Sequence, residues 1–288
     1  MSSGGMSARA APAIGVFDSG FGGLTVLRAL VDRLPGARFS FIGDTARLPY
    51  GSKSRRTIAR YAVESARFLV SEQGAEFLVI ACNTASALAL DAIQDAVSVP
   101  VLGVIEPGAA AARAASSNRD VLVIATDATV QSHAYATACA AQGLRAVEKA
   151  CPLLVPLVEE GWTDHPVTDQ VFRIYLAELM KDCAGLGHAP DALVLGCTHY
   201  PLLRPLIERA VPAGMKVIDS AESTAEAAVR LIDGGDEKAH EDADATASDS
   251  TTTQIACFAT DSVEKFERLG SRFLGRPVGQ VELVDLGG

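Results

Sequence analysis

The sequence reads Phe77-Leu-Val-Ile-Ala-Cys-Asn-Thr-Ala-Ser86 at the place that decides its fold. A mostly apolar run leads into a cysteine, and small and polar residues then begin an Ala/Leu-rich segment. Such a run followed by helical periodicity predicts a buried parallel strand that turns into a helix. Cys82, Asn83 and Thr84 would then lie at the carboxyl end of the strand, where open α/β sheets bind their ligands. The free N–H groups and positive dipole end of the following helix would stabilise an anion or a thiolate.

The same arrangement occurs a second time, at Asp191-Ala-Leu-Val-Leu-Gly-Cys-Thr-His-Tyr200. Cys197 ends the apolar run, and Thr198 and His199 follow it. A single cysteine at the end of a strand is most often a small buried hydrophobe. Two cysteines in matching contexts indicate a shared chemical role.

A glycine-rich turn lies near the start of the chain, in Ile14-Gly-Val-Phe-Asp-Ser-Gly-Phe-Gly-Gly-Leu-Thr25. This pattern predicts a strand, a turn that lets the backbone approach a ligand closely, and a helix whose start binds an anion. The glycines lack the Gly-x-Gly-x-x-Gly spacing, so the pattern does not indicate nicotinamide binding. Asp18, at the end of this strand, is either a helix N-cap or a group that takes part in chemistry.

A second strand is expected over residues 38–44, and it leads to a turn at residues 48–53 that contains Pro49 and Gly51. Tyr50 and free backbone amides on a loop at the end of a strand would suit contact with a substrate. The alternative is an ordinary surface turn.

The pattern restarts at Asp120, which predicts an internal duplication. An apolar run from Val121 to Thr126 holds the place that Ile14 to Ser19 holds in the first half. Asp18 and Cys82 are 64 residues apart, and Thr126 and Cys197 are 71 apart. The sequence therefore predicts two similar α/β halves, each presenting one cysteine to a cleft between them.

Composition excludes several classes of protein. The chain has 288 residues and a formal net charge of −10, with six acids against one lysine over residues 236–250. An acidic chain without a basic cluster argues against nucleic acid or an anionic membrane as the main partner. No apolar run reaches the roughly 18 residues that span a bilayer. Residues 1–12 lack the apolar centre of a secretory signal and are expected to form a flexible extension.

The cysteines are expected to be free thiols. All six are scattered along the chain without Cys-x-x-Cys spacing, which favours neither a disulfide framework nor a zinc site. Cys197 and His199 could supply two metal ligands, but no further ligands stand nearby at familiar spacing, so no metal is expected.

Two thiols on opposite walls of a cleft suit the inversion of a stereocentre. One thiolate removes the α-proton, the other thiol delivers a proton from the far side, and the roles exchange for the reverse reaction. Thiols whose pKa values are lowered from about 8.5 by helix starts could do this near neutral pH. Asp18 and His199 stand near the cysteines in sequence and could move protons on and off sulfur. Glu159 is a further candidate, since it ends an apolar segment.

These stretches resemble the glutamate racemases of the cofactor-independent aspartate/glutamate racemase superfamily, and the resemblance covers nearly everything from Ile14 to Leu286. Five motifs in the family's order carry it: Asp18-Ser-Gly-Phe-Gly-Gly-Leu-Thr25, Gly43-Asp-Thr-Ala-Arg-Leu-Pro-Tyr-Gly51, Ala81-Cys-Asn-Thr-Ala85, Val155-Pro-Leu-Val-Glu159 and Gly196-Cys-Thr-His-Tyr-Pro-Leu-Leu203.

The resemblance implies a catalytic role for five residues. Cys82, assisted by Asp18, would take the α-proton of D-glutamate. Cys197, assisted by Glu159 and His199, would take that of L-glutamate. It also implies a set of groups that hold the carboxylates and ammonium of the substrate. They are Asp18, Ser19, Tyr50, Gly51, Asn83, Thr84, Thr126, Thr129, Thr198 and His199.

The resemblance further implies two pseudo-symmetric α/β domains with mainly parallel sheets and the active site in the cleft between them. The first would comprise residues 13–104 and 217–288, with an acidic flexible loop at 236–252, and the second residues 105–216. The expected function is the cofactor-independent supply of D-glutamate for peptidoglycan, and thus for cell-wall biogenesis and cell shape, in a bacterial cytoplasm. Oligomeric state varies in the family, with a homodimer among the expected states, and some relatives act on DNA gyrase.

Other functions remain open at this point. Aspartate racemase shares the fold and both cysteines, and the size of the pocket would decide between the two substrates. A cysteine hydrolase would use Cys82 or Cys197 as its nucleophile and His199 as its base, and a non-catalytic binder of acidic amino acids would use the same cleft. A pyridoxal enzyme would need a lysine for its Schiff base, and Lys53 lies in a turn without a supporting pattern.

Overall fold

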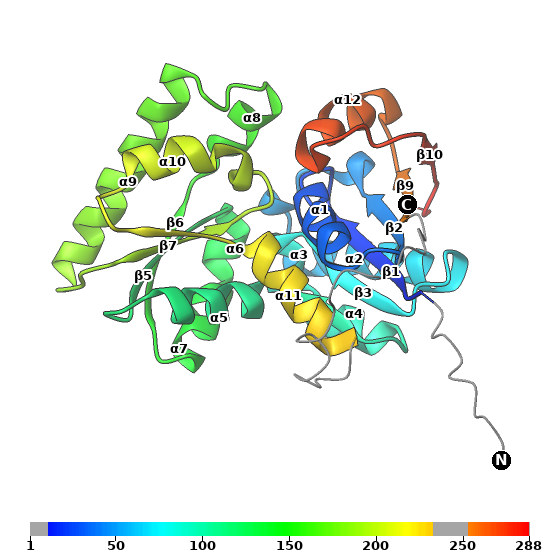
Figure 1. Ribbon diagram of the computed structural model, residues 1–288, viewed down its shortest axis with the longest axis horizontal. Helices are drawn as coiled ribbons and strands as arrows, with labels where there is room; N and C mark the ends of the chain where they lie inside the picture. The colour runs from blue at the N-terminus through cyan, green and yellow to red at the C-terminus, as the bar shows by residue number, and fades with distance from the viewer. Residues whose placement is uncertain (1–10, 233–252, 288) are drawn as a thin grey trace, which may run out of the picture.

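The computed structural model describes residues 11–232 and 253–287, which form two parallel β-sheets flanked by helices (Figure 1). The strand orders are β10-β9-β2-β1-β3-β4 and β6-β5-β7-β8, and all neighbouring strands pair in parallel. This confirms the predicted α/β class. The first sheet contains β1 (Ala13–Asp18), β2 (Arg38–Gly43), β3 (Phe77–Ile80), β4 (Val101–Gly103), β9 (Gln254–Ala259) and β10 (Val281–Leu283), and the second contains β5 (Asp120–Ala125), β6 (Arg145–Ala150), β7 (Ala192–Gly196) and β8 (Lys216–Asp219).

The second sheet repeats the strand order of the first. β5 has β6 on one side and β7 followed by β8 on the other, as β1 has β2 on one side and β3 followed by β4 on the other. The central strands β1, β3, β5 and β7 are buried along their whole length, which explains their nearly continuous apolar sequences. Cys82 comes after β3 and Cys197 directly after β7, so the two cysteines occupy equivalent places at the carboxyl ends of equivalent strands.

Helices cover the faces of both sheets (Figure 1). The helix predicted after Cys82 is broken at Ala89 into two short helices, α3 and α4. The first sheet carries α1 (Leu24–Arg33), α2 (Arg55–Arg67), α3 (Asn83–Leu88), α4 (Leu90–Ala96) and α12 (Val263–Leu274), and the second carries α5 (Ile105–Ala115), α6 (Asp127–Ser132), α7 (Ala134–Ala141), α8 (Leu154–Glu159), α9 (Pro166–Gly185) and α10 (Arg204–Ala210).

We call residues 13–104 with 254–283 the first lobe and residues 105–219 the second lobe. Helix α11 (Ser220–Ile232) lies between them and packs against α1 of the first lobe and α5 of the second. We propose that the lobes are two domains. Because β8 pairs with β7, the chain leaves the second sheet after Asp219 rather than at the expected boundary of residue 217.

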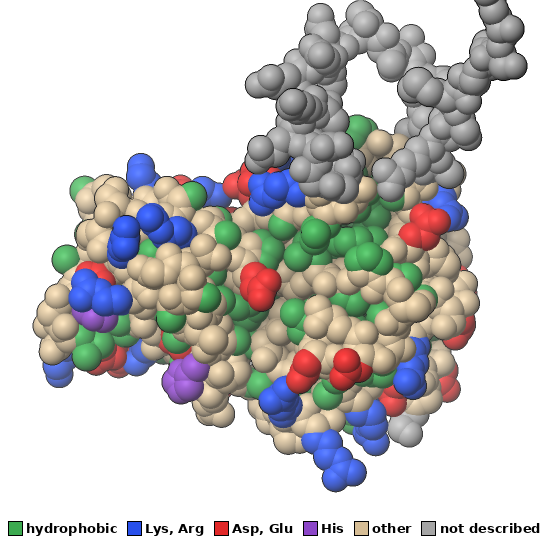
Figure 2. All heavy atoms as spheres, turned by 90° about the horizontal axis from the view of Figure 1, so that it is seen from below, with side chains coloured by type: hydrophobic (Ala, Val, Ile, Leu, Met, Phe, Trp, Pro, Cys, Tyr) green, Lys and Arg blue, Asp and Glu red, His purple; other side chains and the backbone are tan. Residues whose placement is uncertain are grey.

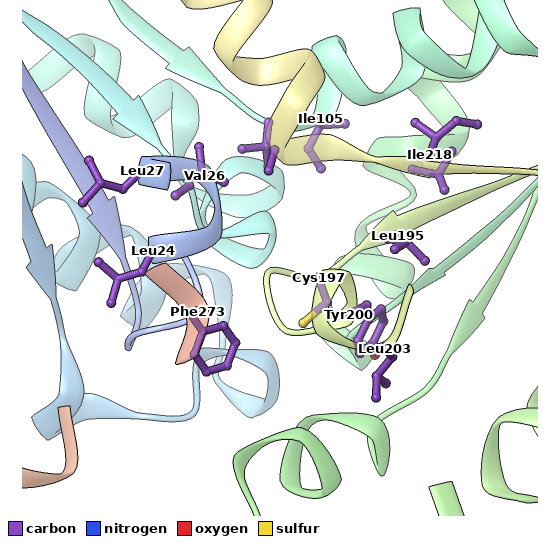
Figure 3. Packing of buried hydrophobic residues seen from close by; sticks show 14 of the residues in the cluster. Leu24, Val26, Leu27, Ile105, Leu195, Cys197, Tyr200, Leu203, Ile218 and Phe273 are labelled. Carbon is purple, nitrogen blue, oxygen red and sulfur yellow. The ribbon is translucent and has the colours of Figure 1, made fainter. Parts of the chain in front are cut away.

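One buried apolar cluster runs through both lobes (Figure 3). Leu24 and Phe273 contribute to it from the first lobe, and Leu195 and Tyr200 from the second, with Ile105 at the start of α5. Each of these side chains is at most 6% exposed. Because apolar burial is the main favourable term in folding, the shared cluster holds the lobes together beside the cleft.

Two expected features lie outside the described residues: most of the extension at 1–12 and all of the acidic loop at 236–252. Among the described helices, none combines the length and the apolar character that crossing a bilayer requires. On the face shown in Figure 2, basic and acidic side chains are interspersed, so this face has no strong field of one sign.

Candidate active site

A cavity of about 420 Å³ lies between the lobes, and both Cys82 and Cys197 line it. Most of the predicted site residues line it as well, while Asp18 and Thr129 are buried behind its wall. The lining comprises Ser19, Leu48, Pro49, Tyr50, Gly51, Ser52, Cys82, Asn83, Thr84, Thr126, Asp127, Pro152, Val155, Pro156, Glu159, Cys197, Thr198, His199 and Lys265. Segments far apart in the sequence thus meet at one small-molecule site of ordinary size.

Cys82 is the N-cap residue of α3. Its Sγ accepts a hydrogen bond from the backbone N–H of Ala85 at 3.4 Å, and its thiol lies 3.4 Å from the hydroxyl oxygen of Ser19. Burial, together with the nearby charge of Asp18, raises the pKa of the Cys82 thiol to about 12. Cys82 is therefore a protonated thiol, able to deliver a proton.

Asp18 ends β1 and is 1% exposed. Its Oδ2 accepts the backbone N–H of Gly20 at 2.9 Å, whereas its Oδ1 has no hydrogen-bond partner among the described residues. The interpretation of Asp18 as a helix N-cap is wrong, because α1 begins at Leu24 with Gly23 at the N-cap position. Burial raises the pKa of Asp18, although the positive charge of His199 opposes this. An unpaired carboxylate oxygen this deep is costly unless it has a use, which favours the chemical role.

The Cys197 side carries a chain of polar groups. The Sγ of Cys197 lies 3.9 Å from Nδ1 of His199, whose Nε2 lies 3.3 Å from Oε1 of Glu159. Burial lowers the pKa of His199, but Cys197 and Glu159 outweigh burial and raise that pKa to about 10. Burial raises the pKa of Glu159, but His199 and Lys265 outweigh it and lower that pKa. The sulfur of Cys197, the imidazole of His199 and the carboxylate of Glu159 thus follow one another on this wall of the cavity.

The polar surroundings of the two thiols therefore differ. Cys82 lies beside Ser19 and the start of α3, while Cys197 lies next to a charged His199. Two thiols on separate walls of one cavity are the arrangement that inversion of a stereocentre requires, in which one group accepts a proton and the other donates one.

Hydroxyl groups join the lobes at the back of the cavity. Thr84 Oγ1 of the first lobe lies 3.0 Å from Thr126 Oγ1 and 3.3 Å from Thr129 Oγ1 of the second. Tyr135, on α7, donates its hydroxyl to Oδ1 of Asn83 at 2.7 Å, and within the described part of the chain the buried Asn83 Nδ2 has no hydrogen-bond partner. The unpaired amide group is available to a ligand.

The turn at 48–53 lines the cavity rather than lying as an ordinary surface turn. Tyr50 is 1% exposed and donates its hydroxyl to Asp44. A Cβ on Gly51 would stand 3.2 Å from the Cβ of Thr126, so the turn packs closely against the second lobe.

Sequence reasoning missed several residues of the site. Asp44 ends a predicted strand and falls within one of the motifs, but its full burial beneath Tyr50 has no sequence signal. Tyr135 lies outside the motifs, and its place beside Asn83 has no sequence signal either. Lys265 stands in an amphipathic helix, where a lysine is indistinguishable from an ordinary solvated one.

Comparisons with known proteins agree on one family. The model of the Asp/Glu/Hydantoin racemase family matches residues 14–228. A glutamate racemase of Koribacter versatilis is 54% identical over 97% of this chain and 99% of its own length. A glutamate racemase isoform of Bacillus anthracis has a TM-score of 0.83 at 36% identity, covering 96% of this chain and 99% of its own. The structure of a Francisella tularensis glutamate racemase in complex with D-glutamate has a TM-score of 0.81 at 33% identity, covering 96% and 98%.

Proposed function

The chain belongs to the Asp/Glu/hydantoin racemase family and interconverts L- and D-glutamate, and on this premise we propose that it does so with two thiols, Cys82 and Cys197. The observation that carries the proposal is that both sulfur-bearing residues line one cavity from separate lobes. Each follows an equivalent central strand of its sheet. Groups that approach a carbon from opposite sides can remove and replace its proton with inversion.

In the direction from L- to D-glutamate, Cys197 takes the α-proton and Cys82 delivers its own proton to the opposite face. The electron pair left on the α-carbon forms the new C–H bond, so Cys82 ends as thiolate and Cys197 as thiol. The reverse reaction uses the opposite roles. Glu159 and His199 assist proton transfer at Cys197, and Asp18, whose charge favours the protonated thiol, assists at Cys82.

Glutamate would bind in the cavity through its two carboxylates and its ammonium. The hydroxyls of Ser19 and Thr84 and the unpaired amide of Asn83 are suitable partners. Further contacts would come from Tyr50, Gly51, Thr126, Thr129, Thr198 and His199. Support comes from the Francisella tularensis relative, which was solved with D-glutamate.

The reaction needs no cofactor, because two thiols supply both the base and the acid. The D-glutamate produced would serve peptidoglycan synthesis in the bacterial cytoplasm, and through it cell-wall biogenesis and cell shape.

The test is racemisation of L-glutamate in deuterium oxide. At early conversion we expect deuterium at the α-carbon of the D-glutamate formed and protium in the recovered L-glutamate, because each thiol exchanges its proton on its own side. Cys82→Ser and Cys197→Ser should each lower kcat by about 10²–10⁴-fold. Full activity in either variant, or deuterium in both enantiomers from the start, would exclude the two-thiol mechanism. A cysteine hydrolase would instead need only one of the cysteines.

A further inference from the structure

The carboxylate of Glu159 is held from two sides that belong to different lobes. Its Oε1 faces His199 Nε2 at 3.3 Å, and its Oε2 faces Lys265 Nζ at 3.2 Å. Glu159 ends α8 of the second lobe, whereas Lys265 is carried by α12 of the first lobe (Figure 1). The polar chain that begins at the sulfur of Cys197 therefore ends on the other lobe.

Aromatic rings enclose His199, the middle member of this series of polar side chains. The ring of Phe21 lies 6.0 Å from that of His199, and the ring of Phe273 lies 5.1 Å from it. Lys265 Nζ stands 5.6 Å from the centre of the Phe21 ring, within cation–π distance. Phe21 and Phe273 are each 1% exposed. These rings exclude water from His199. The charge of its imidazolium therefore interacts more strongly with Glu159 than it would at an open surface.

A second cation on α12 meets the same end of α8. The guanidinium of Arg272 lies against Gly161, with Nη1 2.6 Å from where a Cβ on that glycine would stand. Arg272 follows Lys265 by seven residues, or two helical turns, so both lie on one side of α12. They meet the negative end of the α8 dipole. Of the two, only Lys265 pairs with a carboxylate that contacts His199.

We propose that Lys265 is a positioning residue for the racemisation, whose ammonium fixes Glu159 on His199 and so makes the orientation of His199 beside Cys197 depend on contact between the lobes. The inference rests on the two-thiol function proposed above. Lys265 is not a catalytic residue, because it acts on the sulfur only through Glu159 and His199.

Among the described residues, few charged groups surround the series of polar side chains from Cys197 to Lys265. His199 faces Cys197 and Glu159, with Asp18 also close enough to affect its charge, and Glu159 faces His199 and Lys265. Without Lys265, the Glu159 side chain is free to rotate towards water, and His199 loses the fixed acceptor that orients its ring. Proton removal by Cys197 then slows, while proton removal by Cys82 does not.

The decisive measurement is the primary deuterium isotope effect in each direction. In Lys265→Met we expect kcat/KM to fall about fivefold, as for loss of a partly exposed ion pair. The fall must be equal in both directions, because the enantiomers have the same free energy in water. The isotope effect with α-deuterated L-glutamate should rise, and that with α-deuterated D-glutamate should fall. A general loosening of the cavity would instead raise KM for both enantiomers and leave both isotope effects unchanged, which would overturn the inference.

A double-mutant cycle tests whether Lys265 acts through Glu159. In a Glu159→Gln background, Lys265→Met should change kcat/KM by less than about twofold, because the partner charge is already gone. An undiminished fivefold loss there would contradict the inference. Lys265→Arg keeps the cation and should recover most of the activity. Because Lys265 is partly exposed, the folded fraction should be unchanged, and Lys265→Gln provides a second variant should Met perturb the helix.

Two matched variants separate positioning from other effects. Lys149→Met removes another lysine–glutamate pair, with Glu178, away from the cavity, and should leave both isotope effects unchanged. Arg272→Met removes the neighbouring cation from α12 without touching Glu159. If it shifts the isotope effects as Lys265→Met does, lobe contact alone explains the result and Lys265 has no special role.

The wild-type labelling pattern in deuterium oxide distinguishes a failure of the two-thiol function from a failure of the positioning role of Lys265. Deuterium in the recovered substrate from the start would overturn the two-thiol function and this inference with it. A two-thiol pattern together with unchanged isotope effects in Lys265→Met would overturn this inference alone.

Discussion

Gly22 offers a test of how closely the two lobes must approach. This residue of the glycine-rich turn belongs to the first lobe, but its nearest neighbours belong to the second. A Cβ added there would stand 2.8 Å from Nδ1 and 2.9 Å from Cε1 of His199, and closer still to Oγ1 of Thr198. Ordinary contacts begin at 3.4 Å, so the lobes would have to separate by more than about half an ångström.

We expect Gly22→Ala to lower the free energy of unfolding by about 1–3 kcal/mol, the usual cost of an overpacked contact. The effect on catalysis should be larger. A separation of roughly 1 Å moves His199 and Cys197 of the second lobe away from Cys82 of the first, and misplacements of that size cost about 10²-fold in rate. The assays are urea unfolding and circular dichroism of the glutamate enantiomers, with kcat/KM falling equally in both directions.

Gly20→Ala is the matched control in the same turn. Its Cβ would stand 3.2 Å from a terminal methyl of Leu48, which can move aside. We expect a change in stability of less than about 0.5 kcal/mol and nearly normal activity. Wild-type activity in Gly22→Ala, or equal damage in both variants, would refute the idea that this glycine is needed for close approach of the lobes.

Three further outcomes follow from buried polar groups. Tyr135→Phe should cost about 1–3 kcal/mol of stability and raise KM, because it leaves Oδ1 of Asn83 buried without its donor. Asp44→Asn should cost about 3–5 kcal/mol by urea unfolding, because it breaks a buried ion pair and a hydrogen bond to Tyr50. The stability of the wild type should fall by roughly 3 kcal/mol from pH 6.5 to 9, because the native state keeps the His199 proton up to about pH 10 while the unfolded chain releases it near 6.5. His199→Asn should flatten that slope.

Each of these has its own control. Tyr175→Phe removes a hydroxyl whose only contact among the described residues is a 3.4 Å bond from the exposed Leu153 N–H, and should cost less than about 0.5 kcal/mol. Asp169→Asn breaks the exposed pair with Arg173 and should be nearly neutral. An equally steep pH slope in His199→Asn would show that another group carries the linkage.

The sequence was sufficient to predict those features of the fold that depend on a local pattern of residues. Buried strands, the turns that follow them and the repeated half were predictable, because a fully buried parallel strand is apolar along its whole length and glycine marks close approach. Cys82 and Cys197 stood out because their contexts match. The motifs around them supplied the residues that line the cavity.

The remaining features depend on contacts between distant segments. The sequence allows Asp18 to be a cap or a catalytic group, because a carboxylate after a strand suits both, and only the start of α1 excludes the cap. The pairing of Lys265 with Glu159 joins residues 106 positions apart. No periodicity encodes such a pair, since it arises from the way the last helix of the first lobe packs beside the second.

The first sheet has strands from both ends of the chain, with β9 beside β2. During synthesis at about 5–20 residues per second, β2 would wait roughly 10–40 s for its neighbour, because about 210 residues separate them. Throughout that interval an apolar strand presents an open edge on the ribosome, and such edges recruit other chains. The second lobe, continuous in sequence, can fold first. A protein arranged in this way is expected to depend on chaperones before its last segment emerges, and to be sensitive to stalled translation near its C-terminus.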